Sequence, residues 1–170
     1  MDEVWKEIPD CDYMISNLGR VKSFKQNKAR ILKPGIDTCG YYFVRLTYNN
    51  GKIVNKLIHR LLAEAFIENP DNIQYVDHKN NDRLNNDLSN LRWCSHAQNS
   101  CNRNKQVTKT SSKYKGVSWY KNYQKWYARV MFEGKNYYLG YFATEIEAAL
   151  AYNVAALKFF KQFAKLNLIE

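Results

Sequence analysis

Apolar and polar residues alternate in two stretches near the N-terminus, and this period of two is typical of half-buried β-strands. The first stretch, residues 13–24, predicts a small hairpin that turns at Asn17-Leu18-Gly19. The second pairs residues 41–48 with 52–57 across Asn49-Asn50-Gly51, a sequence that favours a tight turn. The N-terminal third is therefore expected to be rich in β-structure.

After residue 57 the apolar residues take the spacing of a helix that buries one face. They recur three or four residues apart, at Ile58, Leu61, Leu62, Ala65 and Phe66. Asn69-Pro70 ends this helix, because proline cannot continue a helical turn.

Two short strands are predicted next, at residues 75–78 and 91–94. Ser95 provides the N-cap for a helix that runs to about Arg103. Residues 102–113 contain one apolar residue in twelve, which indicates a linker or an extended arm.

The C-terminal third predicts three strands and one long helix. The strands lie at 115–120, 126–133 and 136–141, and Thr144 with Glu147 forms a capping box at the start of the helix. On the second strand we expect Trp126, Ala128, Val130 and Phe132 to face the helix, and Tyr127, Arg129, Met131 and Glu133 to face away. On the third strand the helix-facing residues are Tyr137 and Leu139, and the outward ones are Asn136 and Tyr138.

The composition is that of a folded protein. Of 170 residues, 45% are hydrophobic and 15% aromatic, which permits packed cores and argues against global disorder. No apolar run approaches the roughly 20 residues of a membrane span, and the N-terminus lacks a signal peptide. We therefore expect an intracellular protein with no membrane contact.

The four cysteines, at 11, 39, 94 and 101, form no CxxC pair and are expected to be free thiols. The spacing Cys94-x-His96-x4-Cys101 only weakly resembles a zinc site.

The formal net charge is +10, and +8 of it follows residue 101. A basic C-terminal part suggests a polyanionic partner, most commonly nucleic acid. A basic but merely soluble surface is the alternative.

The chemistry is concentrated in residues 75–99. Asp77 and His78 end an apolar run, a loop rich in Asn follows, and Asn90 and Asn99 come after it. A neutral histidine is a suitable general base, and Asp and Asn oxygens select hard cations such as Mg²⁺ or Mn²⁺. This set suits phosphodiester hydrolysis. Adjacent residues on a regular strand face opposite ways, so Asp77 and His78 share a site only if the strand ends or twists there. An EF-hand is excluded, because residues 80–90 lack its central Gly and closing Glu.

Asp77-His78-Lys79, the Asn-rich loop, Asn90-Leu91-Arg92-Trp93 and Asn99 closely resemble the HNH nucleases of the phage and intron homing type. The resemblance implies a ββα-metal (His-Me finger) core that binds one divalent cation, Mg²⁺ or Mn²⁺, and no small-molecule cofactor. It assigns the catalytic roles to His78, as base, and Asn90, which pins the loop, and makes Asp77 and Asn99 the metal ligands. His96 is the alternative ligand. His59, at the start of a helix, is expected to have a capping or packing role.

Trp5-Lys6-Glu7-Ile8 and Ile15 to Val21 resemble the nuclease-associated modular domain that often precedes HNH units. The same segment also fits a hairpin that completes the nuclease core, and the two interpretations are compatible. The expected layout is a β-rich module at 1–50, the HNH core at 51–104, a basic linker at 105–113 and a C-terminal domain at 114–170.

The C-terminal domain is similar to the Apetala/ethylene-response-factor (ERF) DNA-binding domain. The similarity rests on residues 112–117, 125–126, 138–142, 147–156 and 164–167. It implies that the outward sheet face reads DNA, through Lys115, Ser118, Tyr120, Arg129, Met131, Asn136 and Tyr138. The basic segment before it adds the DNA-binding candidates Arg103, Lys105, Lys109 and Lys113. Plant members carry more arginines, so their GC-rich preference is not carried over.

Together these features predict an α+β protein: a nuclease core followed by a three-stranded antiparallel sheet packed on one helix. The function expected is that of a metal-dependent endonuclease for double-stranded DNA, of a mobile element, phage or virus. A single constellation in 170 residues suggests a monomer. The alternatives are a sequence-specific DNA-binding regulator with an inactive nuclease core and a nuclease directed at RNA.

Overall fold

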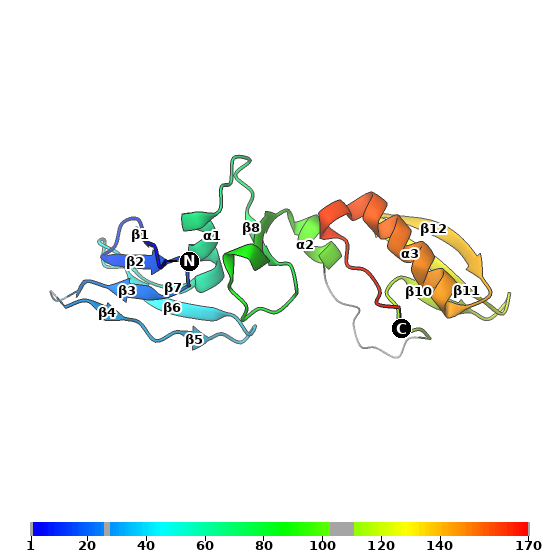
Figure 1. The fold of residues 1–170 in the computed structure, drawn as a ribbon, viewed down its shortest axis with the longest axis horizontal. Coiled ribbons are helices and arrows are strands. Elements are labelled where there is room, and N and C mark those ends of the chain that lie inside the picture. Colours follow the sequence, from blue (N-terminus) through cyan, green and yellow to red (C-terminus); the bar gives the residue numbers. More distant parts are fainter. Residues whose placement is uncertain (1, 26–27, 103–110, 170) are drawn as a thin grey trace. The chain divides into compact units, whose positions relative to one another are not determined.

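The structure is a computed structural model that describes residues 2–25, 28–102 and 111–169. The chain forms two compact units, Met1–Ser95 and His96–Glu170. Figure 1 labels their elements. Within the described residues, no helix is long and apolar enough to cross a membrane.

In its described residues, the first unit contains three small antiparallel sheets and one α-helix (Figure 1). The first sheet has four strands in chain order, β1 (Trp5–Glu7), β2 (Tyr13–Ser16), β3 (Val21–Ser23) and β4 (Arg30–Ile31). The second has three, β5 (Gly35–Ile36), β6 (Tyr42–Thr47) and β7 (Ile53–Leu57). Helix α1 (Ile58–Phe66) follows β7 directly, and a two-stranded sheet, β8 (Tyr75–His78) and β9 (Leu91–Cys94), comes after it, with a 3₁₀ turn at Leu88–Asn90.

One hydrophobic core holds the first unit together. Its buried members come from both predicted hairpins, from α1 and from β9, and include Ile15, Val21, Leu46, Leu62 and Leu91. Helix α1 has no side-chain cap at its N-terminus, so its stability comes from burying this apolar face. The segments expected at 1–50 and 51–104 therefore share one core up to residue 95.

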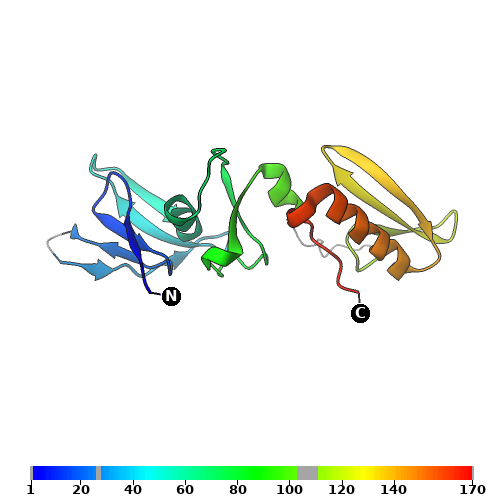
Figure 2. The ribbon, with the colours of Figure 1, turned by 45° about the horizontal axis from the view of Figure 1, so that its top comes forward.

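The second unit is a three-stranded antiparallel sheet with a helix on one face (Figures 1 and 2). It comprises α2 (His96–Asn102), β10 (Val117–Tyr120), β11 (Lys125–Phe132), β12 (Lys135–Phe142), α3 (Glu145–Phe160) and a final 3₁₀ turn, Lys161–Phe163. The expected capping box is present: the Thr144 hydroxyl accepts from the Glu147 N–H, and the Glu147 carboxylate accepts from the Thr144 N–H, both at 3.2 Å. Buried alanines, among them Ala148 and Ala149, let α3 lie close to Ala128 of the sheet.

The predicted α+β architecture is confirmed, and so are the faces of β11. Ala128 and Val130 are buried, whereas Arg129 and Met131 are exposed. On β12, the Tyr137 ring lies 4.7 Å from that of Phe159 on α3, as its helix-facing assignment requires.

The start of the first C-terminal strand was predicted two residues too early. β10 begins at Val117, and Lys115 lies before it, where its N–H donates to the Asn167 side chain at 2.6 Å. Gly116 causes the break, because its left-handed φ of +75° interrupts the extended backbone. A Cβ at this position would lie 2.2 Å from the ring of Tyr152, so packing against α3 requires glycine here.

Candidate active site

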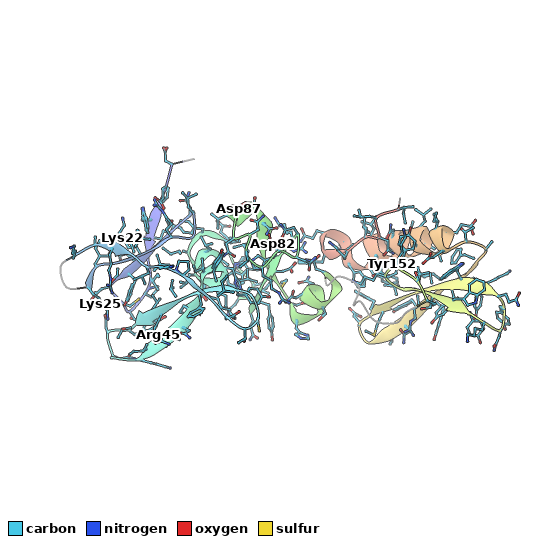
Figure 3. All side chains as sticks on the ribbon, turned by 90° about the horizontal axis from the view of Figure 1, so that it is seen from below. Lys22, Lys25, Arg45, Asp82, Asp87 and Tyr152 are labelled. Carbon is cyan, nitrogen blue, oxygen red and sulfur yellow. The ribbon has the colours of Figure 1, made fainter. Side chains whose placement is uncertain are left out.

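Asp77 and His78 are the last two residues of β8, and both are buried. The strand ends at His78, where the N–H of Asn81 donates to the His78 carbonyl at 2.9 Å and turns the chain into the Asn-rich loop. Asp82 and Asp87 of this loop are labelled in Figure 3. The strand end that a shared site requires is therefore present, although the two side chains have different partners.

The Asp77 carboxylate pairs with Arg92. In the antiparallel register of β8 and β9 these residues stand opposite each other. The Arg92 guanidinium donates from Nε at 2.8 Å and from Nη2 at 2.7 Å, both to Oδ2 of Asp77. Since both side chains are largely buried, each compensates the charge of the other away from bulk water. The sequence alone did not assign a role to Arg92. The signal that could have found it is the antiparallel pairing of the two predicted strands, which places Arg92 opposite Asp77.

Asn90 holds the loop between β8 and β9 closed. Its side-chain amide donates to the Asn80 side chain at 3.0 Å and to the Asn85 carbonyl at 2.7 Å. Its Oδ1 accepts from the Asn80 N–H at 3.1 Å, and its carbonyl accepts from the Lys79 N–H at 2.9 Å. These contacts tie the residues that follow His78 to the start of β9, the geometry that a loop-pinning residue needs.

The imidazole of His78 has an amide on one side and a ring on another. Its Nε2 lies 3.0 Å from Oδ1 of Asn86, and its ring centroid lies 5.0 Å from that of His59 on α1. Because an amide oxygen only accepts, Nε2 is the donor in this contact. Asn86 was not singled out in the sequence, since nothing distinguishes it from the other asparagines of the loop.

His59 packs rather than caps. Leu57 occupies the N-cap of α1, and His59 is 5% exposed, with its ring 4.9 Å from that of Tyr41. Its Nδ1 is buried and has no hydrogen-bond partner. Burial, and secondarily the neighbouring His78, lower the pKa of His59 to about 3, so this imidazole is neutral at physiological pH.

Two family models match consecutive parts of the chain: the NUMOD4 motif at residues 3–47 and the HNH endonuclease model at residues 56–101. DNA endonuclease I-HmuI of Bacillus phage SP01 is 35% identical over 120 residues, which cover 69% of this chain and 67% of that protein. The chain belongs to the HNH homing endonuclease family.

Other HNH proteins are also similar. H-N-H endonuclease F-TflII of Escherichia phage T5 is 41% identical over 92 residues, 52% of this chain and 46% of that one. Uncharacterized HNH endonuclease L245 of Acanthamoeba polyphaga mimivirus is 46% identical over 100 residues, 58% of this chain. The present chain spans 29% of the length of L245 and 25% of that of a second mimivirus relative, L247.

A solved structure described as "DNA binding and cleavage by the HNH homing endonuclease I-HmuI" matches with a TM-score of 0.51 and 36% identity. The match covers 57% of this chain and 55% of that one. It supports the HNH fold. The segments matched by the two family models end at residue 101, so they assign no family to the C-terminal sheet and helix.

The metal ligands implied for the HNH site are chemically suited to a hard cation. Asp77 offers a carboxylate beside His78, and Asn99 offers an amide oxygen. Asn99 and His96 lie on α2, which belongs to the second unit, whereas Asp77 and His78 belong to the first. Among the described residues, no group of three or more His, Cys, Asp and Glu side chains could hold a metal ion.

A zinc site at the cysteines gains no support. Cys11, Cys39 and Cys94 are free, and the side chain of Cys101 lies outside the described part. Burial, and secondarily Asp77, raise the pKa of Cys94 to about 11, which keeps it a thiol rather than a metal-binding thiolate.

The predicted DNA-binding residues fall into three groups. Arg103, Lys105 and Lys109 lie outside the described residues. Four exposed residues form a patch of directly opposed pairs on β11 and β12, Arg129 with Tyr138 and Met131 with Asn136. Of the others, Lys115 lines the same cavity as Arg129, Met131 and Asn136.

Lys113 and Lys115 precede β10, and Ser118 is partly buried on it. Tyr120 belongs to a cluster of tyrosines whose ring centroids lie 5.0–6.4 Å apart, namely Tyr120, Tyr123, Tyr127 and Tyr141. Sequence reasoning did not identify this cluster, because it depends on strand register and on the turn at Tyr123.

Proposed function

We propose that this chain is a metal-dependent endonuclease that hydrolyses phosphodiester bonds in double-stranded DNA, as a nick or a double-strand cut. The observation that carries the proposal is the placement of His78. It is buried at the end of β8 next to Asp77, just before a loop that Asn90 closes, inside the segment that matches the HNH endonuclease model.

In this proposal His78 is the general base. The Asn86 amide oxygen holds the proton on Nε2, so that Nδ1 can take a proton from the attacking water. Asn90 is a positioning residue. It fixes the loop that carries Asn86, and Asn86 in turn orients the imidazole of His78.

Asp77 and Asn99, with His96 as the alternative to Asn99, would hold one Mg²⁺ or Mn²⁺. When bound, such an ion stabilises the charge that develops on the phosphate and on the leaving oxygen. Arg92 keeps the Asp77 carboxylate in place through its two hydrogen bonds to Oδ2.

The second unit would select the site on DNA, in the manner of the ERF-type domain that its sequence resembles. The support is an exposed patch on one sheet face that combines a guanidinium with an amide, Arg129 and Asn136, two side chains suited to base edges in the major groove. The four lysines and arginines between residues 102 and 113 add sequence-independent attraction to phosphates.

The test is cleavage of supercoiled plasmid by the purified chain in Mg²⁺, with EDTA and His78→Ala as controls. We expect cleavage that needs the metal, and a His78→Ala variant that binds DNA while its cleavage rate falls by about 10²–10⁴-fold. DNA binding without cleavage by the unaltered chain would instead indicate a DNA-binding regulator with an inactive nuclease core. Activity that depends on one tightly held zinc would contradict the assignment of oxygen ligands.

A further inference from the structure

Helix α3 has apolar side chains on two opposite faces. One face packs on the sheet of the second unit through residues such as Ala148, Tyr152 and Ala156. The opposite face exposes four large apolar side chains, Ile146 (43%), Leu150 (48%), Val154 (70%) and Leu157 (51%). In the described part of the second unit, the sheet lies on one side of α3 (Figure 2). A helix that is apolar on both sides is normally covered on both.

The four exposed residues form one continuous seam. Their spacings of four, four and three residues keep them within about 80° of one another around the helix, at 100° per residue. At 1.5 Å per residue the seam, from Ile146 to Leu157, is about 16 Å long, or three turns. This is the spacing with which one helix packs along another.

The charges beside the seam identify the partner. Glu147 stands at its N-terminal end and Lys158 at its C-terminal end, on the same side of it and both exposed. If a second α3 packs antiparallel across a two-fold axis at the middle of the seam, Glu147 of each copy faces Lys158 of the other. A parallel arrangement would leave Glu147 of one copy and Lys158 of the other at opposite ends of the seam, so they could not pair. The glutamate also disfavours a nucleic-acid phosphate as the occupant.

We propose that the exposed seam of α3 binds the same seam of a second copy of this chain, antiparallel and two-fold symmetric. A seam of three turns is short compared with standard protein interfaces, so the contact is weak and reversible in free solution. Two copies on one DNA molecule are held at high local concentration, which favours the pair. Such a dimer differs from the monomer expected from the sequence, in which only one set of HNH residues occurs. It would bring two HNH sites together. It does not depend on the proposed nuclease activity.

The test is sedimentation velocity of the full chain over a wide range of protein concentration. We expect a monomer–dimer equilibrium, and Val154→Glu should weaken association at least tenfold. Met131→Glu is the matched control, because Met131 is also exposed and apolar (64%) but lies on the sheet face opposite α3. Circular dichroism checks that each variant is folded.

A charge pair of variants tests the antiparallel geometry. Lys158→Glu would place two carboxylates together at each end and should weaken association by about three- to tenfold. Adding Glu147→Gln should restore most of it, since glutamine removes the repulsion and still completes the capping box at Thr144. Three outcomes would overturn the proposal: a monomer at every concentration, a Val154→Glu dimer as strong as the original, or a monomer whose seam variants lose stability because the chain covers its own seam.

Discussion

The imidazole rings of His59 and His78 lie 5.0 Å apart with their planes at 63°. His59 comes from the first turn of α1 and His78 from the end of β8, so the contact fixes the proposed base against the helix. Because His59 is buried with an unpartnered Nδ1, it serves as a neutral packing surface. Because His59 is neutral when folded, the free energy of unfolding should depend on pH.

We predict that acid destabilises the first unit partly through His59. Its pKa is about 3 in the folded chain, against an ordinary value of 6.5, so between these values the unfolded chain binds the proton and the folded chain does not. The stabilisation is therefore complete above about pH 6.5 and is lost as the pH falls toward 3, by at most about 1.4 kcal/mol per pH unit. Urea unfolding across this range measures the slope. His59→Phe should reduce it, and an unchanged slope in that variant would contradict the assignment.

Asn86 is predicted to act through His78. Asn86→Ala removes the oxygen that holds the proton on Nε2, and we expect cleavage to fall about tenfold with DNA affinity unchanged. The double variant with His78→Ala should be no slower than His78→Ala alone, because the two residues act as one unit. Asn85→Ala is the matched control in the same loop, and its side chain accepts from the Asp87 N–H instead. Independent, multiplicative losses in the double variant would show that Asn86 has a separate role.

Arg92 is predicted to be a major determinant of stability. Arg92→Leu leaves the buried Asp77 carboxylate without its charge partner, which should reduce the free energy of unfolding by about 3–5 kcal/mol. Adding Asp77→Asn removes the buried negative charge and should recover part of the loss. Arg45→Leu, at an exposed arginine that pairs with Asn55, should cost less than about 0.5 kcal/mol in the same urea experiment. Equal losses for Arg92→Leu and Arg45→Leu would rule out a special role for the ion pair.

The strands and helices could be predicted from sequence because their signals are local. Turn residues such as Asn49-Asn50-Gly51 and the capping box at Thr144 act within a few residues of themselves. The start of β10 could not be predicted, because Gly116 is required by the ring of Tyr152, 36 positions away, labelled in Figure 3.

The same difference separates the parts of the candidate site. The sequence identifies Asp77, His78 and Asn90 by type and order, but their partners depend on tertiary structure. Arg92 meets Asp77 only through the register of β8 and β9, and His59 meets His78 only where α1 packs. The loop has several asparagines, and only the folded loop distinguishes Asn86 from the rest.

The outward patch on β11 and β12 is predicted to read DNA bases, and Lys113 before β10 is predicted to contact a phosphate. Arg129→Ala should relax the preference at one or two base pairs, at a cost of about 1–3 kcal/mol. Lys113→Ala should weaken binding to all sequences alike and make the salt dependence shallower by about one unit, since each phosphate contact contributes about 0.9 to the slope. Binding-site selection followed by affinity measurement over a salt series, with His78→Ala as the common background, separates the two effects. The patch does not read bases if Arg129→Ala selects the same sequence as its parent and changes only the salt slope.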